Sequence, residues 1–220
     1  MSYRLLIFDF DGTLADSFGW FVGNINRIAV AHGCRPLDLG RLDEYRGLGA
    51  RALMAQLGMP LWKVPAVTAA MRRSMDASID AIRPFPGALE LLQALRTAGV
   101  QTAVVSSNSR DNVARVLGAG AALVDHYGCG VSIFGKRPVL RRMLQASRVA
   151  AGAALAVGDE TRDGEAAAAA GIDFVGVAWG YATPAALRPL SRRPPFTRFE
   201  EILDAATGAP PPTPTVRRGA

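Results

Sequence analysis

The stretch Leu5-Leu6-Ile7-Phe8-Asp9-Phe10-Asp11-Gly12-Thr13-Leu14 decides the fold of this chain. An apolar run of strand length ends there in two carboxylates spaced two residues apart. Because successive side chains of a strand point to opposite faces, Asp9 and Asp11 are expected to point the same way at the end of a buried strand. Two like charges held together repel each other. The pattern therefore predicts either a cation between the carboxylates, or a proton on one of them while the other attacks.

Length and composition fit a globular protein of one domain with an insertion, or of two small domains. The chain has 220 residues, of which 50% are hydrophobic and 20% are charged. No apolar run reaches the roughly 18 residues of a membrane helix, and the first residues show no signal-peptide pattern. Cys34 and Cys129 lie far apart, without the spacing of metal ligands. We therefore expect a cytoplasmic location and no membrane partner.

The net charge of +6 comes from an excess of arginine, because the 25 basic residues include only two lysines. The arginines are scattered along the chain and are not gathered in one stretch with interleaved aromatic residues. Nucleic acid is therefore not the expected partner, and a small anionic substrate explains the sign of the charge equally well.

Short apolar strands alternate with helical patterns over most of the chain. The expected strands cover residues 3–10, 100–105, 153–157 and 173–178, and the expected helices cover 87–98, 109–117, 138–147 and 163–170. This alternation predicts an α/β protein with a parallel sheet. In such sheets ligands bind beyond the carboxyl ends of the strands.

Residues 16–83 interrupt the alternation, because their apolar residues recur at helical spacing and no strand is evident. We expect a core formed by residues 1–15 and 84–206, with 16–83 inserted as a helical cap. Pro84-Phe85-Pro86-Gly87 forms a stiff point of return to the core. Residues 207–220 are proline-rich and are predicted to be a disordered tail.

Polar residues follow the other expected strands as well. Ser106-Ser107-Asn108-Ser109 lies where a strand meets a helix N-terminus, which suits an anion or a simple helix cap. Lys136 stands just before an expected helix. A single lysine at a protein surface is usually solvated. Gly158-Asp159-x-x-x-Asp163 places two carboxylates where a divalent cation could bind, although Asp163 also fits an ordinary first-turn residue.

Taken in this order, the segments resemble the haloacid dehalogenase-like hydrolase superfamily over residues 3–206. The matching motifs are Asp9-x-Asp11-Gly12-Thr13, Ser106, Lys136 and Gly158-Asp159-x-x-x-Asp163. Residues 9–17 and the helical cap are most similar to the phosphoglycolate phosphatase group. The resemblance implies a Rossmann-like core, Mg²⁺ as cofactor, and hydrolysis of a small phosphorylated metabolite through an aspartyl-phosphate.

The resemblance also implies roles for single residues. Asp9 would be the nucleophile and a metal ligand, and Asp11 the general acid and base, with its backbone carbonyl on the metal. Asp159 would bind Mg²⁺ directly, and Asp163 would act directly or through another ligand. Phosphoryl oxygens would be held by Ser106, Ser107 and Lys136.

Several alternatives within and outside this superfamily remain. A dehalogenase lacks the second acid, so Asp11 argues against that activity. A sugar-phosphate mutase would carry a histidine in the early cap helix, and the run from Phe18 to Phe21 has none. A phosphonate hydrolase would need a cap lysine, for which Lys63 is the only candidate. A pyrophosphatase and a non-catalytic binding protein also remain.

The cap offers two candidate specificity residues. Arg46 and Arg51 flank a glycine-rich turn, and residues 16–83 carry more basic than acidic side chains. Either both arginines are solvated surface residues, or one of them pairs with a second anionic group of the substrate. Phosphoglycolate, other sugar or organic-acid phosphates, nucleotides and pyrophosphate all fit this pattern, and the sequence carries no signal of oligomeric state.

Overall fold

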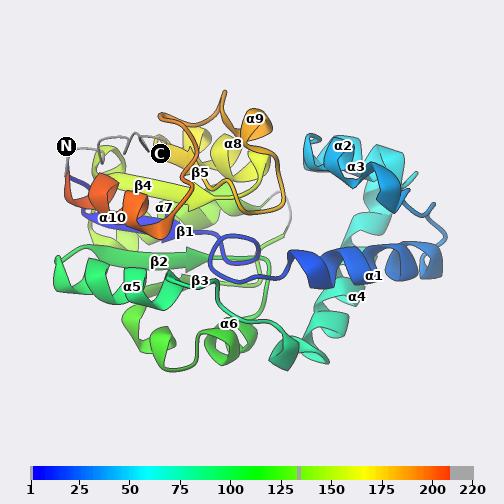
Figure 1. Ribbon diagram of the computed structural model, residues 1–220, viewed down its shortest axis with the longest axis horizontal. Coiled ribbons are helices and arrows are strands. Elements are labelled where there is room, and N and C mark those ends of the chain that lie inside the picture. The colour runs from blue at the N-terminus through cyan, green and yellow to red at the C-terminus, as the bar shows by residue number, and fades with distance from the viewer. Residues whose placement is uncertain (1, 133–134, 209–220) are drawn as a thin grey trace, which may run out of the picture.

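The computed structural model describes residues 2–132 and 135–208, and its centre is a parallel five-stranded sheet (Figure 1). The strand order is β3-β2-β1-β4-β5. The strands are β1 (Leu5–Phe8), β2 (Gln101–Val105), β3 (His126–Gly128), β4 (Ala154–Gly158) and β5 (Asp173–Gly176). In register, Leu5 of the central strand pairs with Gln101 on one side and with Ala154 on the other. The predicted α/β fold with a parallel sheet is confirmed.

Both faces of the sheet are covered by helices, because its central strands are apolar on both sides. Leu6 and Phe8 belong to one buried cluster, and Leu5 and Ile7 to another. The first cluster packs under α5 (Ala88–Thr97), α6 (Arg110–Leu117) and α10 (Phe199–Thr207). The second packs under α7 (Lys136–Ser147), α8 (Thr161–Ala170) and α9 (Pro184–Leu187).

A second group of helices lies beside the sheet, on the right of Figure 1. It comprises α1 (Phe18–Ala31), α2 (Leu42–Arg46), α3 (Ala50–Gln56) and α4 (Val64–Asp76). These helices share their own buried cluster, which includes Ile25, Met54 and Val67. We call residues 16–83 the helical insertion. The chain leaves and re-enters the sheet region at one place, where the Asp16 amide donates to the Arg83 carbonyl.

Short 3₁₀ turns connect the longer elements, at Leu39–Arg41, Leu61–Lys63, Ile79–Ala81, Gly118–Leu123 and Ala151–Ala153. Within the described ranges, no helix is both long and apolar enough to cross a membrane.

The four expected strands are present, with ends that differ by up to two residues, and the structure adds β3, α9 and α10. The edge strand β3 has three residues and no apolar run, so no periodicity marked it. Helix α7 begins at Lys136, two residues earlier than expected. Thr207 is the last residue of α10 and is therefore ordered, whereas the rest of the expected tail, from residue 209, lies outside the described residues.

Candidate active site

The candidate site lies at the carboxyl ends of β1 and β4, in the middle of the sheet. β2 and β3 lie on one side of β1, and β4 and β5 lie on the other. A crevice forms where the strand order reverses in this way, and ligands bind there in open α/β sheets. Asp9 directly follows β1 and Asp159 directly follows β4, so this topology brings residues 150 positions apart in the sequence together.

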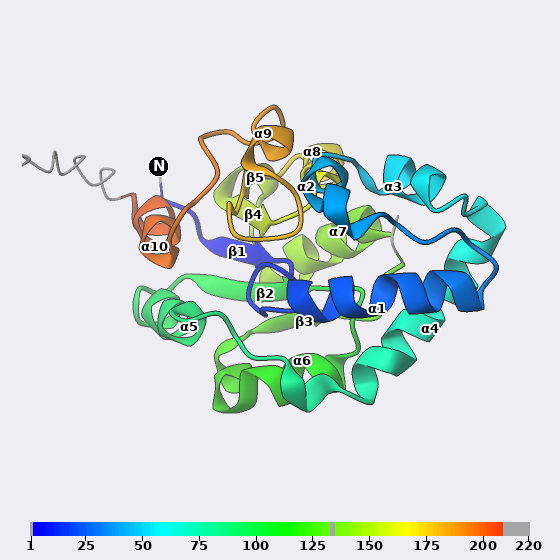
Figure 2. The same cartoon turned by 45° about the vertical axis from the view of Figure 1, so that its right-hand side comes forward.

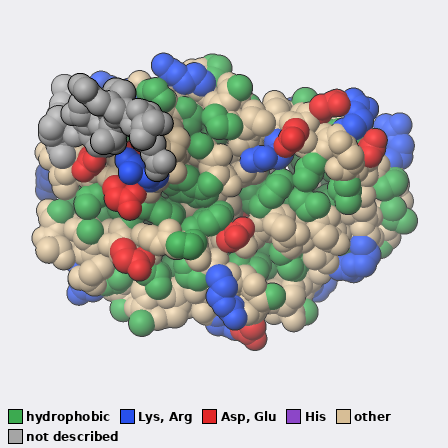
Figure 3. All heavy atoms as spheres, viewed as in Figure 1, with side chains coloured by type: hydrophobic (Ala, Val, Ile, Leu, Met, Phe, Trp, Pro, Cys, Tyr) green, Lys and Arg blue, Asp and Glu red, His purple; other side chains and the backbone are tan. Residues whose placement is uncertain are grey.

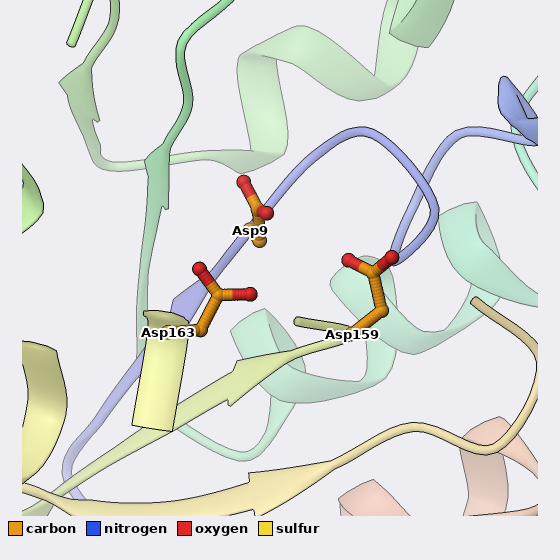
Figure 4. A group of neighbouring side chains, drawn as sticks. All are labelled: Asp9, Asp159 and Asp163. Carbon is orange, nitrogen blue, oxygen red and sulfur yellow. The ribbon is translucent and has the colours of Figure 1, made fainter. Parts of the chain in front are cut away.

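Three buried carboxylates meet at this point. Asp9, Asp159 and Asp163 each offer an oxygen within 4.8 Å of the others. Figure 4 shows them turned toward one another from the end of β1, the end of β4 and the start of α8. Exposed fractions are 6%, 0% and 6%, so water screens their mutual repulsion poorly.

Lys136 lies between two of these carboxylates. Its Nζ is 2.8 Å from Asp9 Oδ2 and 2.5 Å from Asp163 Oδ1. Burial alone would lower the pKa of this lysine, but the charges of Asp163 and Asp9 outweigh it and raise the pKa. The ammonium group therefore stays charged and is buried, rather than solvated as most lysines are.

Asp159 is held rigidly by its neighbours. Its Oδ1 accepts a hydrogen bond from the Thr13 hydroxyl at 2.8 Å, and its Oδ2 accepts one from the Tyr181 amide at 2.8 Å. Glycine is required on both sides: a Cβ at Gly12, where φ is +78°, would lie 2.2 Å from Asp159 Oδ2, and one at Gly180 would lie 2.1 Å from Asp159 Cβ. Burial and the charge of Asp9 raise the pKa of Asp159 well above its usual value.

Asp163 serves the helix and the site together. Its Oδ2 accepts from the Glu160 amide at 3.0 Å, and the two side chains form a capping box at the start of α8. Its Oδ1 faces Lys136. Burial would raise the pKa of this carboxyl, but Lys136 and Arg162 together lower it, so Asp163 is ionised.

The donor set fits a divalent cation. Burial raises the pKa of Asp9 to about 7, although Lys136 opposes that change. Three carboxylates with one ammonium group leave an excess of negative charge in a buried place. Hard cations such as Mg²⁺ prefer carboxylate oxygens, and a cation here would relieve the repulsion that raises the pKa of Asp9 and Asp159.

Asp11 faces away from this group. Its side chain is outside the three-carboxylate cluster, and its Oδ2 lies 3.5 Å from Ser106 Oγ and 3.4 Å from Asn108 Nδ2. Among the described residues, Asp11 Oδ1 is buried without a hydrogen-bond partner. Burial raises the pKa of this carboxyl above its ordinary value. The two acids of the first motif therefore occupy two different environments.

A cavity of about 240 Å³ opens in front of Asp11. Ser107 and Asn108 line it from the sheet side, and side chains of α1 to α4 line it from the helical insertion. Figure 3 shows hydrophobic side chains gathered on the middle of this face, where the sheet region meets the insertion.

The predicted phosphate-binding residues lie beside Asp11. Ser106 is buried, and its Oγ accepts a hydrogen bond from the Asn108 amide at 2.9 Å. Ser107 lines the cavity. These positions agree with the expected place of a phosphoryl group, and their role in binding stays a prediction.

The two candidate specificity arginines lie in different places. Arg46 donates from Nε to the Tyr181 carbonyl at 3.1 Å and from Nη2 to the Gly180 carbonyl at 2.9 Å. It thereby ties α2 to the loop after β5, and the Thr183 amide donates in return to the Arg46 carbonyl. Figure 2 shows α2 next to the loop that runs from β5 to α9. Arg51 is exposed and does not line the cavity.

Three further residues contribute to the site and were not predicted from the sequence. Thr13 holds Asp159, Asn108 contacts Asp11, and Tyr181 donates its amide to Asp159. The Tyr181 ring also packs edge-on against Phe18 and Phe21 of α1. Thr13 and Asn108 lie inside motifs already singled out. Tyr181 lies five residues after the end of β5, behind Val177-Ala178-Trp179-Gly180, so no polar residue at the strand end marked it.

Known proteins resemble this chain over most of its length. A family model described as haloacid dehalogenase-like hydrolase matches residues 6–177. A Synechococcus elongatus phosphoglycolate phosphatase is 33% identical over 180 residues, which cover 81% of this chain and 85% of the relative. A Mycobacterium tuberculosis protein named tyrosine-protein kinase PtkA is 33% identical over 193 residues, which cover 82% of this chain and 64% of that protein.

Solved structures share the fold. A Lactobacillus plantarum protein, crystallised as a phosphoglycolate phosphatase candidate, superimposes with a TM-score of 0.76 at 23% identity, covering 93% of this chain and all of the other. Because the two sequences are only 23% identical, this structural similarity supports the fold and not a shared activity. The family match and the sequence relatives confirm the predicted family and its phosphatase class. The chain therefore belongs to the haloacid dehalogenase-like hydrolases.

Proposed function

We propose that this protein is a Mg²⁺-dependent phosphatase that hydrolyses a small phosphate monoester through an aspartyl-phosphate on Asp9. One observation carries the proposal: Asp9, Asp159 and Asp163 form a buried cluster at the crevice of the sheet, and Lys136 contacts Asp9 and Asp163. Asp11, two residues after Asp9, lines the neighbouring cavity. The named phosphatase relatives support it.

Asp9 is proposed as the nucleophile. Its Oδ1 accepts from the Phe10 amide at 2.8 Å and its Oδ2 faces Lys136, so the carboxylate is fixed in one orientation. An Asp9 oxygen forms a bond to phosphorus while the bond from phosphorus to the ester oxygen breaks. Water then attacks the same phosphorus, which releases phosphate and restores the Asp9 carboxylate.

Asp11 is proposed to move the proton in both steps. Burial raises its pKa, so it holds a proton nearer neutral pH than a solvated aspartic acid does. It gives that proton to the departing alkoxide and later takes one from the attacking water. Its place at the cavity, outside the carboxylate cluster, suits an acid that faces the leaving group.

Positive charge and N–H donors near the transferred group are proposed to stabilise it. Lys136 offsets charge on Asp9 and on the phosphoryl oxygens, and Ser106 and the Ser107 amide add hydrogen bonds. Mg²⁺ would be held by Asp9, Asp159, Asp163 and the Asp11 carbonyl, and when bound it neutralises charge that develops on the phosphoryl oxygens.

The substrate is proposed to be a small phosphorylated metabolite, and phosphoglycolate is the named substrate of several relatives. A phosphonate hydrolase is less well supported. The Lys63 ammonium group donates to the carbonyls of His32 and Gly33, and Lys63 does not line the cavity. A cytoplasmic location also stays a prediction.

The test uses p-nitrophenyl phosphate and the Asp9→Asn variant. Chelation of divalent cations should abolish turnover and added Mg²⁺ should restore it. Asp9→Asn should lose all detectable turnover and fail to trap a phosphoryl-mimicking metallofluoride. Asp111→Asn, which changes an exposed carboxylate on α6, is the matched control and should behave as wild type. Full activity in excess chelator, or normal turnover by Asp9→Asn, would contradict the proposal.

A further inference from the structure

The cavity in front of Asp11, which we call the chamber, is larger and more apolar than a two-carbon leaving group requires. Its volume is about 240 Å³, and it runs from Asp11, Ser107 and Asn108 into the helical insertion. Small-ligand sites in proteins are mostly apolar, with a few polar groups that orient the ligand. The polar end of the chamber is therefore the end where the phosphoryl group is proposed to bind.

The far walls of the chamber are hydrophobic. Phe21, Leu48, Leu53 and Met71 line it, and all four are only partly buried although they pack against the cluster of the insertion. Phe18 lines it beside Tyr181. The part of these side chains that the protein leaves uncovered faces the chamber. An apolar ligand would remove that surface from water.

The arginines that line the chamber already have acceptors. Arg46 donates to the Gly180 and Tyr181 carbonyls, and Arg162 pairs with Glu160. Arg72 of α4 donates from Nη2 to the Val131 carbonyl at 2.7 Å. Its Nε is buried without a partner among the described residues. A guanidinium has five N–H donors, so Arg72 can still donate from Nε to an oxygen of the leaving group.

We propose that the preferred substrate is a phosphate monoester of an alcohol whose body is apolar and longer than glycolate. This inference rests on the proposed function and adds the chemical class of the leaving group. The alkyl or aryl body fills the chamber between Phe21, Leu53 and Met71, while the phosphoryl group stays at Asp9.

Unbranched alkyl phosphates from ethyl to pentyl test the proposal, with phosphoglycolate as the charged comparison and Mg²⁺ present throughout. The alcohols leave with similar basicity, so differences in kcat/KM report contacts with the chamber. Each added methylene that enters the chamber should raise kcat/KM about fourfold. Pentyl phosphate should also exceed phosphoglycolate. A flat or falling series, or phosphoglycolate above every alkyl phosphate, would overturn the proposal.

Variants of one chamber residue locate the effect. Leu53→Asn should lower the ratio of kcat/KM for pentyl over ethyl phosphate, and Leu53→Met, which keeps the volume and the apolar character, should retain it. Leu61→Asn changes an exposed leucine outside the chamber and should also leave the ratio unchanged. An unchanged ratio in folded Leu53→Asn would count against the chamber.

The proposed phosphatase function and the proposed substrate class can be contradicted separately. If p-nitrophenyl phosphate and every alkyl phosphate resist Mg²⁺-dependent hydrolysis, the proposed function is wrong and the substrate class falls with it. If they are hydrolysed without any preference for chain length, the phosphatase stands and only the chamber inference is wrong.

Discussion

Two aspartates separated by one residue have opposite surroundings in this protein. Asp9 lies 2.8 Å from an ammonium group and beside two further carboxylates. Asp11 instead lies 3.5 Å from Ser106 Oγ and 3.4 Å from Asn108 Nδ2, and it forms no ion pair with any residue that the structure describes. The alternation of a strand predicts that both point the same way, but β1 ends at Phe8, before either of them. The turn that follows separates the proposed nucleophile from the proposed proton carrier.

The buried carboxylates predict a pH dependence for the metal-free protein. The pKa of Asp9 is raised to about 7 in the folded state, so between pH 4 and 7 the folded protein keeps a proton that the unfolded chain releases. Stability should therefore fall as pH rises, by roughly 2–3 kcal/mol between pH 5 and pH 8. The raised pKa of Asp159 acts in the same direction. Thermal unfolding in chelator at the two pH values measures the difference.

Asp9→Asn provides the control for this pH effect. It removes one titrating group and also the charge that helps to raise the pKa of Asp159, so the loss of stability between pH 5 and pH 8 should shrink. Saturating Mg²⁺ should also reduce the loss in the wild type, because the cation binds the ionised carboxylates. An equal pH dependence in Asp9→Asn and wild type would show that other groups cause it.

At the level of elements, the sequence predicted what local patterns determine. Apolar runs marked four of the five strands, and polar residues at their ends marked Asp9, Ser106, Asp159 and Asp163. The three-residue β3 was missed, because its place is set by pairing with β2 and not by its own composition. The contacts of Arg46 were missed because they join residues about 135 positions apart, which no local pattern encodes.

The contact between α2 and the loop after β5 predicts how Arg46 acts. Arg46→Met keeps much of the side chain's length but removes the donors to the Gly180 and Tyr181 carbonyls. That loop holds Asp159 through the Tyr181 amide, so kcat/KM should fall by a similar factor, about tenfold or more, for every monoester. Arg41→Met, at an exposed ion pair with Glu44, is the control and should have little effect. A loss confined to substrates with a second anionic group would instead show that Arg46 reads the substrate.

At the level of the whole molecule, the candidate site joins the sheet region and the insertion. The insertion has a buried cluster of its own, while a cluster of the sheet includes three further residues of the insertion, Met75, Ile79 and Ile82. The sheet region supplies every carboxylate of the site, and the insertion supplies most of the chamber. The two are linked by the chain near Ala15 and Pro84 and by Arg46. If the proposed function is right, chemistry and specificity are divided between these two regions, and substitutions in the insertion should change the accepted leaving group without disturbing the carboxylate cluster.

This division predicts that Mg²⁺ stabilises the fold through the sheet region alone. At a hundredfold excess over its dissociation constant the cation should add about 2.7 kcal/mol to the free energy of unfolding. For a chain of 220 residues that corresponds to a rise in Tm of about 5–11 °C. Asp159→Asn should remove most of the rise, whereas Leu53→Asn in the insertion should retain it. If the rise in Tm of Asp159→Asn were as large as in wild type, Mg²⁺ would bind elsewhere and not at Asp159.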